Sequence, residues 1–158
     1  MSAVEARLRS MALEIPPVPE PGGKYASAVR VENLLFLSGV IGTAYQDGRW
    51  SLPFIGKVGA ELSIEQGYAS ARLCALNHIA ILKQELGTLD RVIKIVKLVG
   101  YVNSAPKFTK APLVLDGASD LLVNAFAKEI GLHARAAVYQ HEMSFNAPIE
   151  TELTVWVE

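Results

Sequence analysis

Two charged residues near the end of the chain lie in segments that otherwise predict strands. Arg135 is part of the apolar run HARAAV, and Glu150 follows fifteen positions later in APIETEL. Removing a guanidinium from water is costly unless a carboxylate or a phosphate pairs with it. Two alternatives explain Arg135: a structural ion pair with Glu150 or Glu152 across two antiparallel strands, or the binding of an anionic ligand.

A second group of candidate residues lies earlier in the chain. Ser38 and Gly39 end a predicted strand in FLSGVIG, and Tyr25 stands thirteen positions before Ser38. Small residues at this point are typical of a bend at a sheet edge. Because glycine also lets a backbone amide come close to a ligand, the pattern allows both a structural and a ligand-binding role.

Other reactive side chains show no arrangement that predicts chemistry. His78, His133 and His141 are far apart, and none belongs to a Cys/His cluster or an HExxH pattern. GxSxG, P-loop and GxGxxG motifs do not occur in the sequence. We therefore expect no metal site and no cofactor. Cys74 is interpreted as a small buried thiol of a helix, and His78 on the same helix as a structural imidazole.

Composition and charge indicate one domain without an obvious charged partner. Of 158 residues, 51% are apolar, and 15 basic and 16 acidic residues leave a net charge of −1. Nothing in this balance favours nucleic acid or an anionic membrane as a partner. No apolar run approaches the roughly 20 residues of a membrane-spanning helix. A single cysteine and the lack of a signal-peptide core predict a cytoplasmic protein.

The first 21 residues predict a helix and a linker. Val4, Leu8, Met11 and Ile15 have the spacing of a short amphipathic helix, and the proline-rich stretch IPPVPEPGG ends it. We divide the chain into this appended segment, residues 1–21, and a main domain, residues 22–158. The apolar stripe predicts that the helix packs on the protein instead of forming a loose tail.

Turn and capping signals predict the remaining elements. A hairpin over 24–39 turns at Glu-Asn, and residues 43–59 predict a loop with room for a short strand. Ser63 and Gln66 form a capping box for a helix over 64–86, which ends at Gly87. A second helix over 116–131 has Ser119 or Asp116 as its candidate cap. Strands are predicted at 92–103, 135–143 and 149–157.

This order predicts an α+β fold with two helices on one face of a mostly antiparallel sheet of four or five strands. The apolar residues of LLFLSG and LTVWV are too numerous for one covered face. We therefore expect a second copy of the chain to cover the other face.

Several ordered landmarks together resemble the YjgF/Rid family, whose members are also called reactive-intermediate deaminases or L-PSP endoribonucleases. They are Tyr25, FLSG with Ser38, GKVG, the helix containing ALNHI, HARAAV and APIETEL. The most specific landmark is the arginine of HARAAV with a glutamate fifteen positions on, because family members carry ARSCV and an IEIE strand at that separation. The resemblance covers residues 22–158.

The resemblance implies a chorismate-mutase-like fold assembled as a homotrimer, with a ligand cleft at each subunit interface. It also implies hydrolysis of 2-imino and enamine acids to 2-oxo acids and ammonia. Arg135 would then bind the substrate carboxylate, Glu150 would hold the attacking water, and Ser38, Gly39 and Tyr25 would line the cleft. A planar guanidinium suits a carboxylate, and an imine is electrophilic enough to need no metal or organic cofactor. A non-catalytic protein that binds small carboxylates on the same fold is the alternative.

The chain departs from the family pattern at two places. Ala137 stands where typical members have a cysteine, and the segment between Phe108 and Arg135 is longer than usual. The asparagine that members carry in this segment has two candidate counterparts, Asp116 and Ser119. These differences concern the identity of the substrate.

Overall fold

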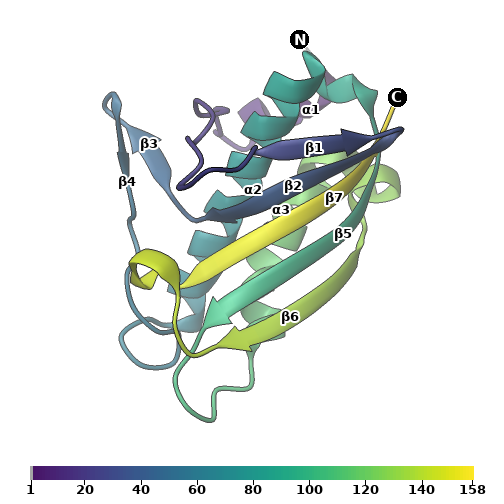
Figure 1. Cartoon of the computed structure of the whole chain (residues 1–158). Coiled ribbons are helices and arrows are strands. Elements are labelled where there is room, and N and C mark those ends of the chain that lie inside the picture. The colour runs from purple at the N-terminus through teal and green to yellow at the C-terminus, as the bar shows by residue number, and fades with distance from the viewer. Residues whose placement is uncertain (1) are drawn as a thin grey trace.

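A five-stranded sheet forms the centre of the protein, whose computed structural model describes residues 2–158 (Figure 1). The strands are β1 (Ala28–Val31), β2 (Leu34–Ile41), β5 (Val92–Asn103), β6 (Ala134–Gln140) and β7 (Ile149–Val157). Their order across the sheet is β1-β2-β7-β5-β6. Every neighbouring pair is antiparallel except β5 and β6, which are parallel. The predicted α+β fold with a mostly antiparallel sheet is confirmed.

Two long helices, α2 (Ile64–Leu86) and α3 (Ala111–Gly131), cover one face of this sheet (Figure 1). The predicted capping box of α2 is present, with reciprocal hydrogen bonds between Ser63 and Gln66, and Gly87 ends the helix with a φ of 74°. The helices approach closely at Gly117, where an added Cβ would lie 2.0 Å from the Tyr68 carbonyl oxygen. Glycine is therefore required at this crossing.

The core lies between the two helices and the sheet. Ile79 and Leu82 of α2, Leu115 of α3, and Leu98 and Val155 of the sheet are all fully buried. Burying one such side chain stabilises the fold by roughly 1.5–3 kcal/mol. This layer is the main source of stability for the segments that carry the candidate site.

The start of α3 differs from the prediction. The helix begins at Ala111 with Pro112 in its first turn and without a side-chain cap. Proline fits this position because its missing N–H is not needed in a first turn. Asp116 and Ser119, the predicted caps, lie inside the helix instead and contact Arg135.

The segment 43–59 contains more structure than the predicted loop. It forms a two-stranded hairpin of β3 (Ala44–Gln46) and β4 (Arg49–Ser51) around Asp47 and Gly48, which both have positive φ. The Asp-Gly pair is the turn signal that this hairpin required. Two short 3₁₀ helices, η1 (Leu89–Arg91) and η2 (Ser144–Asn146), complete the fold.

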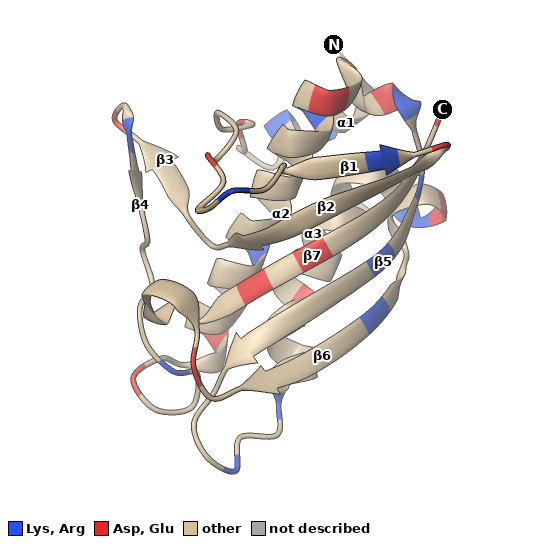
Figure 2. Ribbon diagram, viewed as in Figure 1, with Lys and Arg blue, Asp and Glu red and all other residues tan. Residues whose placement is uncertain are grey.

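One of the two alternatives for Arg135, an ion pair with Glu150 or Glu152, is wrong. β5 lies between the strands that carry these residues, because α3 connects β5 to β6 as a parallel crossover. Arg135 is paired in register with Leu98, which faces the helices and is fully buried, whereas Glu150 lies on the opposite face of the sheet. Figure 2 shows the acidic positions of β7 between β2 and β5, and the basic position of β6 at the sheet edge.

The face of the sheet without helices carries apolar side chains on its β1-β2-β7 half. Leu34 is paired with Val31 on one side and with Trp156 on the other, and Phe36 is paired with Val29. All five are between 37% and 56% exposed. We call these five residues the open apolar face.

The N-terminal helix packs on its own chain, as its apolar stripe predicts. α1 (Ala3–Ser10) buries Val4 and Leu8, while Met11 and Ile15 follow the helix and pack partly against the core. Arg7 donates a hydrogen bond to the Ala125 carbonyl of α3. The cost of fixing this short helix is thus offset by contacts with the main body.

A capping box and one ion pair fix the start of α1. Ser2 and Glu5 exchange hydrogen bonds, and Lys83 of α2 lies 2.9 Å from a Glu5 carboxylate oxygen. The hydrogen bond from the Ser2 amide and the neighbouring ammonium of Lys83 lower the pKa of Glu5 to about 2. The carboxylate is therefore ionised throughout the neutral range.

Removal of the first 14 residues should lower the melting temperature, because it exposes the surface that Val4 and Leu8 cover. Leu8→Ala in the full chain should cost ~2–5 kcal/mol of unfolding free energy, as for other buried leucines. Arg9→Ala, on the exposed side of the same helix, is the matched control. Chemical denaturation of the three proteins measures the effect, and equal stability of Leu8→Ala and wild type would contradict the observed packing.

Candidate functional site

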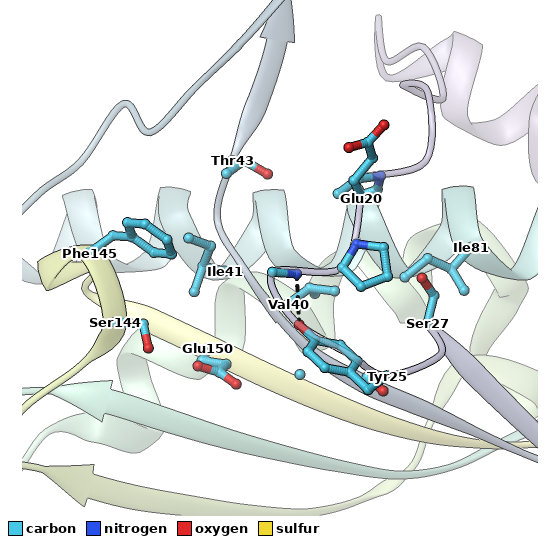
Figure 3. A pocket seen from close by; sticks show the side chains of 15 residues that line it. Glu20, Tyr25, Ser27, Val40, Ile41, Thr43, Ile81, Ser144, Phe145 and Glu150 are labelled. Atoms are coloured by element: carbon cyan, nitrogen blue, oxygen red, sulfur yellow. Dashed lines mark hydrogen bonds between the residues drawn. The ribbon is translucent and has the colours of Figure 1, made fainter.

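A cavity of about 420 Å³ lies at one end of β2, beside the proline-rich linker. Tyr25, Ser38, Gly39 and Glu150 line it, so four of the five predicted site residues share one cavity. Figure 3 shows the Glu150 carboxylate and the Tyr25 ring projecting into the same space from β7 and from the segment before β1. Arg135, the fifth, is not among the lining residues.

A β-bulge in β2 creates the space for Glu150. The register between β2 and β7 shifts between Leu37 and Val40, so Ser38 and Gly39 lie in the irregular stretch. An added Cβ at Gly39 would lie 2.1 Å from a Glu150 carboxylate oxygen. Glycine is therefore needed here for space, and this close approach explains the glycine that the sequence places at the end of the strand.

The environment of Glu150 changes its proton affinity. The residue is half-buried, and burial raises the pKa of its carboxyl group above the ordinary value, with a further increase from the negative charge of Glu152. A carboxylate with a raised pKa is a better proton acceptor near neutral pH than an exposed one. Glu150 is thus the side chain of this cavity best suited to proton transfer.

Ser38 and Tyr25 hold the wall of the cavity together. The Ser38 hydroxyl donates a hydrogen bond of 2.7 Å to the Ala26 carbonyl, and the Tyr25 hydroxyl accepts one of 3.1 Å from the Gly22 amide. Both hydroxyls are therefore engaged within the chain. Their geometry favours shaping the cavity over attacking a substrate.

Two parts of the wall were not predicted from the sequence. Pro19 and Glu20 of the linker line one side, and Ser144 and Phe145 of η2 line another (Figure 3). Phe145 is 76% exposed and has a φ of 58°. Neither segment carries a sequence motif, so no local signal could have identified it.

The layer beneath Glu150 is fully buried. His78 Nε2 lies 3.0 Å from both the carbonyl and the hydroxyl oxygen of Thr151, the residue after Glu150. Burial lowers the pKa of His78 to about 4, so the imidazole is neutral at physiological pH. Burial raises the pKa of the Cys74 thiol, so the thiol stays protonated and is a poor nucleophile. The interpretation of Cys74 as a buried thiol is confirmed.

Arg135 belongs to a second polar group on the helix side of the sheet. Its Nη1 donates to Asp116 Oδ1 at 2.8 Å and to Ser119 Oγ at 3.0 Å, and its Nη2 donates to the Pro112 carbonyl at 3.1 Å. Asp116 and Ser119 were the two candidate counterparts of the family's asparagine. Both lie against the arginine.

Within residues 2–158, no three His, Cys, Asp or Glu side chains are grouped so that they could hold a metal ion. Over the same residues, no helix has both the length and the apolar character needed to cross a membrane.

Comparison with known proteins identifies the family. The sequence model described as "YjgF/chorismate mutase-like, putative endoribonuclease" matches residues 5–153. The chain therefore belongs to the YjgF family, which confirms the resemblance found in the sequence. Its α+β fold agrees with this membership.

Three relatives resemble this chain over nearly its whole length. Protein TCP17 of Trypanosoma cruzi is 37% identical over 152 residues, covering 96% of this chain and 92% of TCP17. A putative endoribonuclease from Shewanella oneidensis is 35% identical with a TM-score of 0.91, covering 99% of this chain and all of the other. Protein Atu1372 of Agrobacterium tumefaciens, of unknown function, is 31% identical with a TM-score of 0.88, covering 99% and 93%.

Gly39→Ala should remove most of the function of the cavity without unfolding the protein. The new methyl group collides with the Glu150 carboxylate, which must rotate away, whereas the backbone at Gly39 does not require a positive φ. Gly48→Ala is unsuitable as a control, because the φ of 78° at Gly48 would strain an alanine there. Ala44→Gly in β3 is the control instead. Because the displaced carboxylate and the new methyl group take up space in the cavity, weaker ligand binding with an unchanged circular dichroism spectrum is the expected result. Unaltered binding by Gly39→Ala would show that Glu150 does not need this position.

Proposed function

We propose that this protein hydrolyses reactive imines and their enamine tautomers to carbonyl compounds and ammonia. The class predicted from the sequence is the 2-imino acids, which give 2-oxo acids. The observation that carries the proposal is Glu150, a half-buried carboxylate with a raised pKa that projects into an open cavity. Family membership supports the same broad chemistry.

The reaction needs one group that first accepts and then returns a proton. Glu150 accepts a proton from a water molecule as the water oxygen bonds to the imine carbon. Glu150 returns that proton to the nitrogen, which gives the neutral carbinolamine. Glu150 then takes the proton of the carbinolamine hydroxyl and passes it to the nitrogen as the carbon–nitrogen bond breaks, so that ammonia leaves and the carbonyl forms. A pKa shifted toward neutrality suits both steps. All atoms of the products come from the imine and one water molecule.

In this proposal, the arginine of the predicted site comes from a second copy of the chain. Arg135 and Glu150 of one chain lie on opposite faces of the sheet. A homotrimer with clefts between subunits would bring the Arg135 group of one subunit to the cavity of the next. The open apolar face supports such an assembly, since a patch of exposed large apolar side chains is typical of an interface.

Two other activities have less support. Ribonuclease activity, named in the descriptions of the family and of the Shewanella protein, requires contacts with phosphate, and the cavity lining contains Glu20 and Glu150 but no lysine or arginine from residues 2–158. A non-catalytic protein that binds small carboxylates remains the second candidate. The hydrogen bonds that Ser38 and Tyr25 make within the chain support it, because hydroxyls that shape a cavity can serve binding without a reaction.

Glu150→Gln should reduce imine hydrolysis by ~10²-fold or more, in the range of general-base effects, with little change in ligand affinity. The assay generates 2-aminoacrylate in solution and follows its loss with and without protein. Because the folded protein raises the pKa of Glu150, the ionised carboxyl lowers stability at neutral pH, so Gln should leave the melting temperature equal or higher.

Glu152→Gln is the matched control for this experiment. It should remain active at neutral pH, and it should shift the acidic limb of the pH profile to lower pH, because Glu152 contributes to the raised pKa of Glu150. Wild-type protein that binds its ligand but never accelerates hydrolysis over buffer would favour the binding protein.

The isolated protein should have a mass near three times its 17.1 kDa chain mass by light scattering. Phe36→Glu should dissociate it, because a charge would be buried in the interface, while Phe36→Leu keeps the apolar surface and should remain trimeric. A wild-type monomer at micromolar concentration would contradict the shared cleft.

A further inference from the structure

Phe145 of η2 is an exposed aromatic side chain in the wall of the cavity that holds Glu150. Its side chain is 76% exposed, so it contributes little to the hydrophobic core. Figure 3 shows Phe145 and Tyr25 on opposite sides of the Glu150 carboxylate, and all three line the cavity. A large apolar side chain in this position is available to a ligand.

The backbone at Phe145 is strained. Its φ of 58° and ψ of 17° lie in the left-handed region, which bulky residues rarely adopt. The next residue, Asn146, has a φ of 51°, but asparagine tolerates this conformation better. Strain of this kind is typical of functional sites, where the surrounding structure maintains it. Because the Phe145 side chain is exposed, burial of its ring does not offset the strain.

Polar contacts behind η2 hold this turn in place. The Gly56 amide donates a hydrogen bond of 2.9 Å to the Asn146 carbonyl, and Asn103 Nδ2 donates one of 3.0 Å to Asn146 Oδ1. Asn103 is fully buried, and its Oδ1 accepts a hydrogen bond of 2.7 Å from Lys57 Nζ. These bonds fix the residue directly after Phe145. They therefore restrict the positions of its ring before any ligand binds, which lowers the entropic cost of binding.

Other apolar side chains extend this wall. Val40 and Ile41 of β2 and Ile81 of α2 line the same cavity. Its volume of about 420 Å³ lies in the range of pockets that bury a drug-sized molecule, roughly 300–1,000 Å³. A small imine such as 2-aminoacrylate leaves most of this space empty. The remaining space suits a large apolar substituent on the substrate.

We propose that Phe145 determines substrate specificity, and that the preferred substrates are imines that carry an aromatic substituent. The imine carbon lies at Glu150, and the substituent extends toward η2. There its ring packs against Phe145 in an offset or edge-to-face arrangement, which adds affinity beyond the burial of apolar area. This inference rests on the proposed function, because Glu150 supplies the reacting centre.

Three unreactive 2-oxo acids with the same head group test the inference. They are 2-oxobutyrate, 2-oxo-4-phenylbutyrate and 2-oxo-4-cyclohexylbutyrate, and isothermal titration calorimetry measures their binding to the assembled protein. Wild type should bind the phenyl probe at least ~10-fold more tightly than 2-oxobutyrate. It should bind the phenyl probe roughly 2- to 10-fold more tightly than the cyclohexyl probe, the range of an aromatic pair. Equal affinity for the two ring probes, or no binding of any probe, would overturn the inference.

Substitutions of Phe145 test its role directly. Phe145→Ala should remove most of the preference for the phenyl over the cyclohexyl probe, and Phe145→Tyr should retain it. Tyr45→Ala is the matched control, because Tyr45 is an exposed aromatic residue of β3 that contacts Trp50 and is not among the lining residues. It should keep the wild-type preference. An unchanged preference in Phe145→Ala would refute the role of Phe145.

Two further measurements separate specificity from a structural role. Phe145→Gly suits a φ of 58°, so it should keep or raise the melting temperature while it loses the preference for the phenyl probe. A lower melting temperature would show that the ring stabilises the fold. Light scattering should give Phe145→Ala the same mass as wild type. A change in mass would assign the ring to a contact between subunits and overturn the inference.

An assay of imine hydrolysis on the same proteins distinguishes this inference from the proposed function. If wild type hydrolyses 2-aminoacrylate but shows no preference for the phenyl probe, the inference is rejected and the proposed function stands. If wild type prefers the phenyl probe through Phe145 but hydrolyses no imine, the catalytic function is rejected and Phe145 remains the determinant of ligand specificity.

Discussion

The parallel pairing of β5 with β6 determines where both polar groups of this protein lie. A parallel connection needs a crossover, and α3 provides it on the helix-covered face. β6 therefore becomes an edge strand, and Arg135 faces α3 instead of β7. An antiparallel return of β6 beside β7 would have joined Arg135 to Glu150 within one chain. The topology instead leaves each chain with two separate polar groups.

The bulge at Ser38 and Gly39 determines the surroundings of Glu150. In a regular ladder, the side chain of Glu150 would have lain on a flat open surface and kept ordinary carboxyl properties. The irregular stretch and the linker surround it, and partial loss of water raises its pKa. Burial without a cation in contact destabilises an ionised carboxylate, so ionised Glu150 lowers the stability of the fold at neutral pH.

Local signals in the sequence predicted the elements well and their arrangement less well. The hairpin of β1 and β2, the capping box at Ser63 and the stop at Gly87 depend on near neighbours, and all three are present. The start of α3 was misplaced because Asp116 and Ser119 are good caps by residue type, while Pro112 marks the true first turn. Their contact with Arg135 depends on how α3 lies over β6, which no local pattern contains. Tyr25, Ser38, Gly39 and Glu150 were predicted together through family resemblance, since residues 125 positions apart share no local signal.

The linker couples the cavity to the N-terminal helix. Pro19 and Glu20 form part of the wall, and the chain before them is anchored through α1, which contacts α2 and α3. Proline restricts the backbone conformations of the linker that forms this wall. The linker therefore loses little conformational entropy when a ligand binds. Docking of α1 and occupancy of the cavity are consequently linked equilibria. If docking of α1 increases the affinity for a ligand that touches the linker, that ligand increases the docking equilibrium of α1. The two factors are equal, because the coupling free energy is the same in both directions.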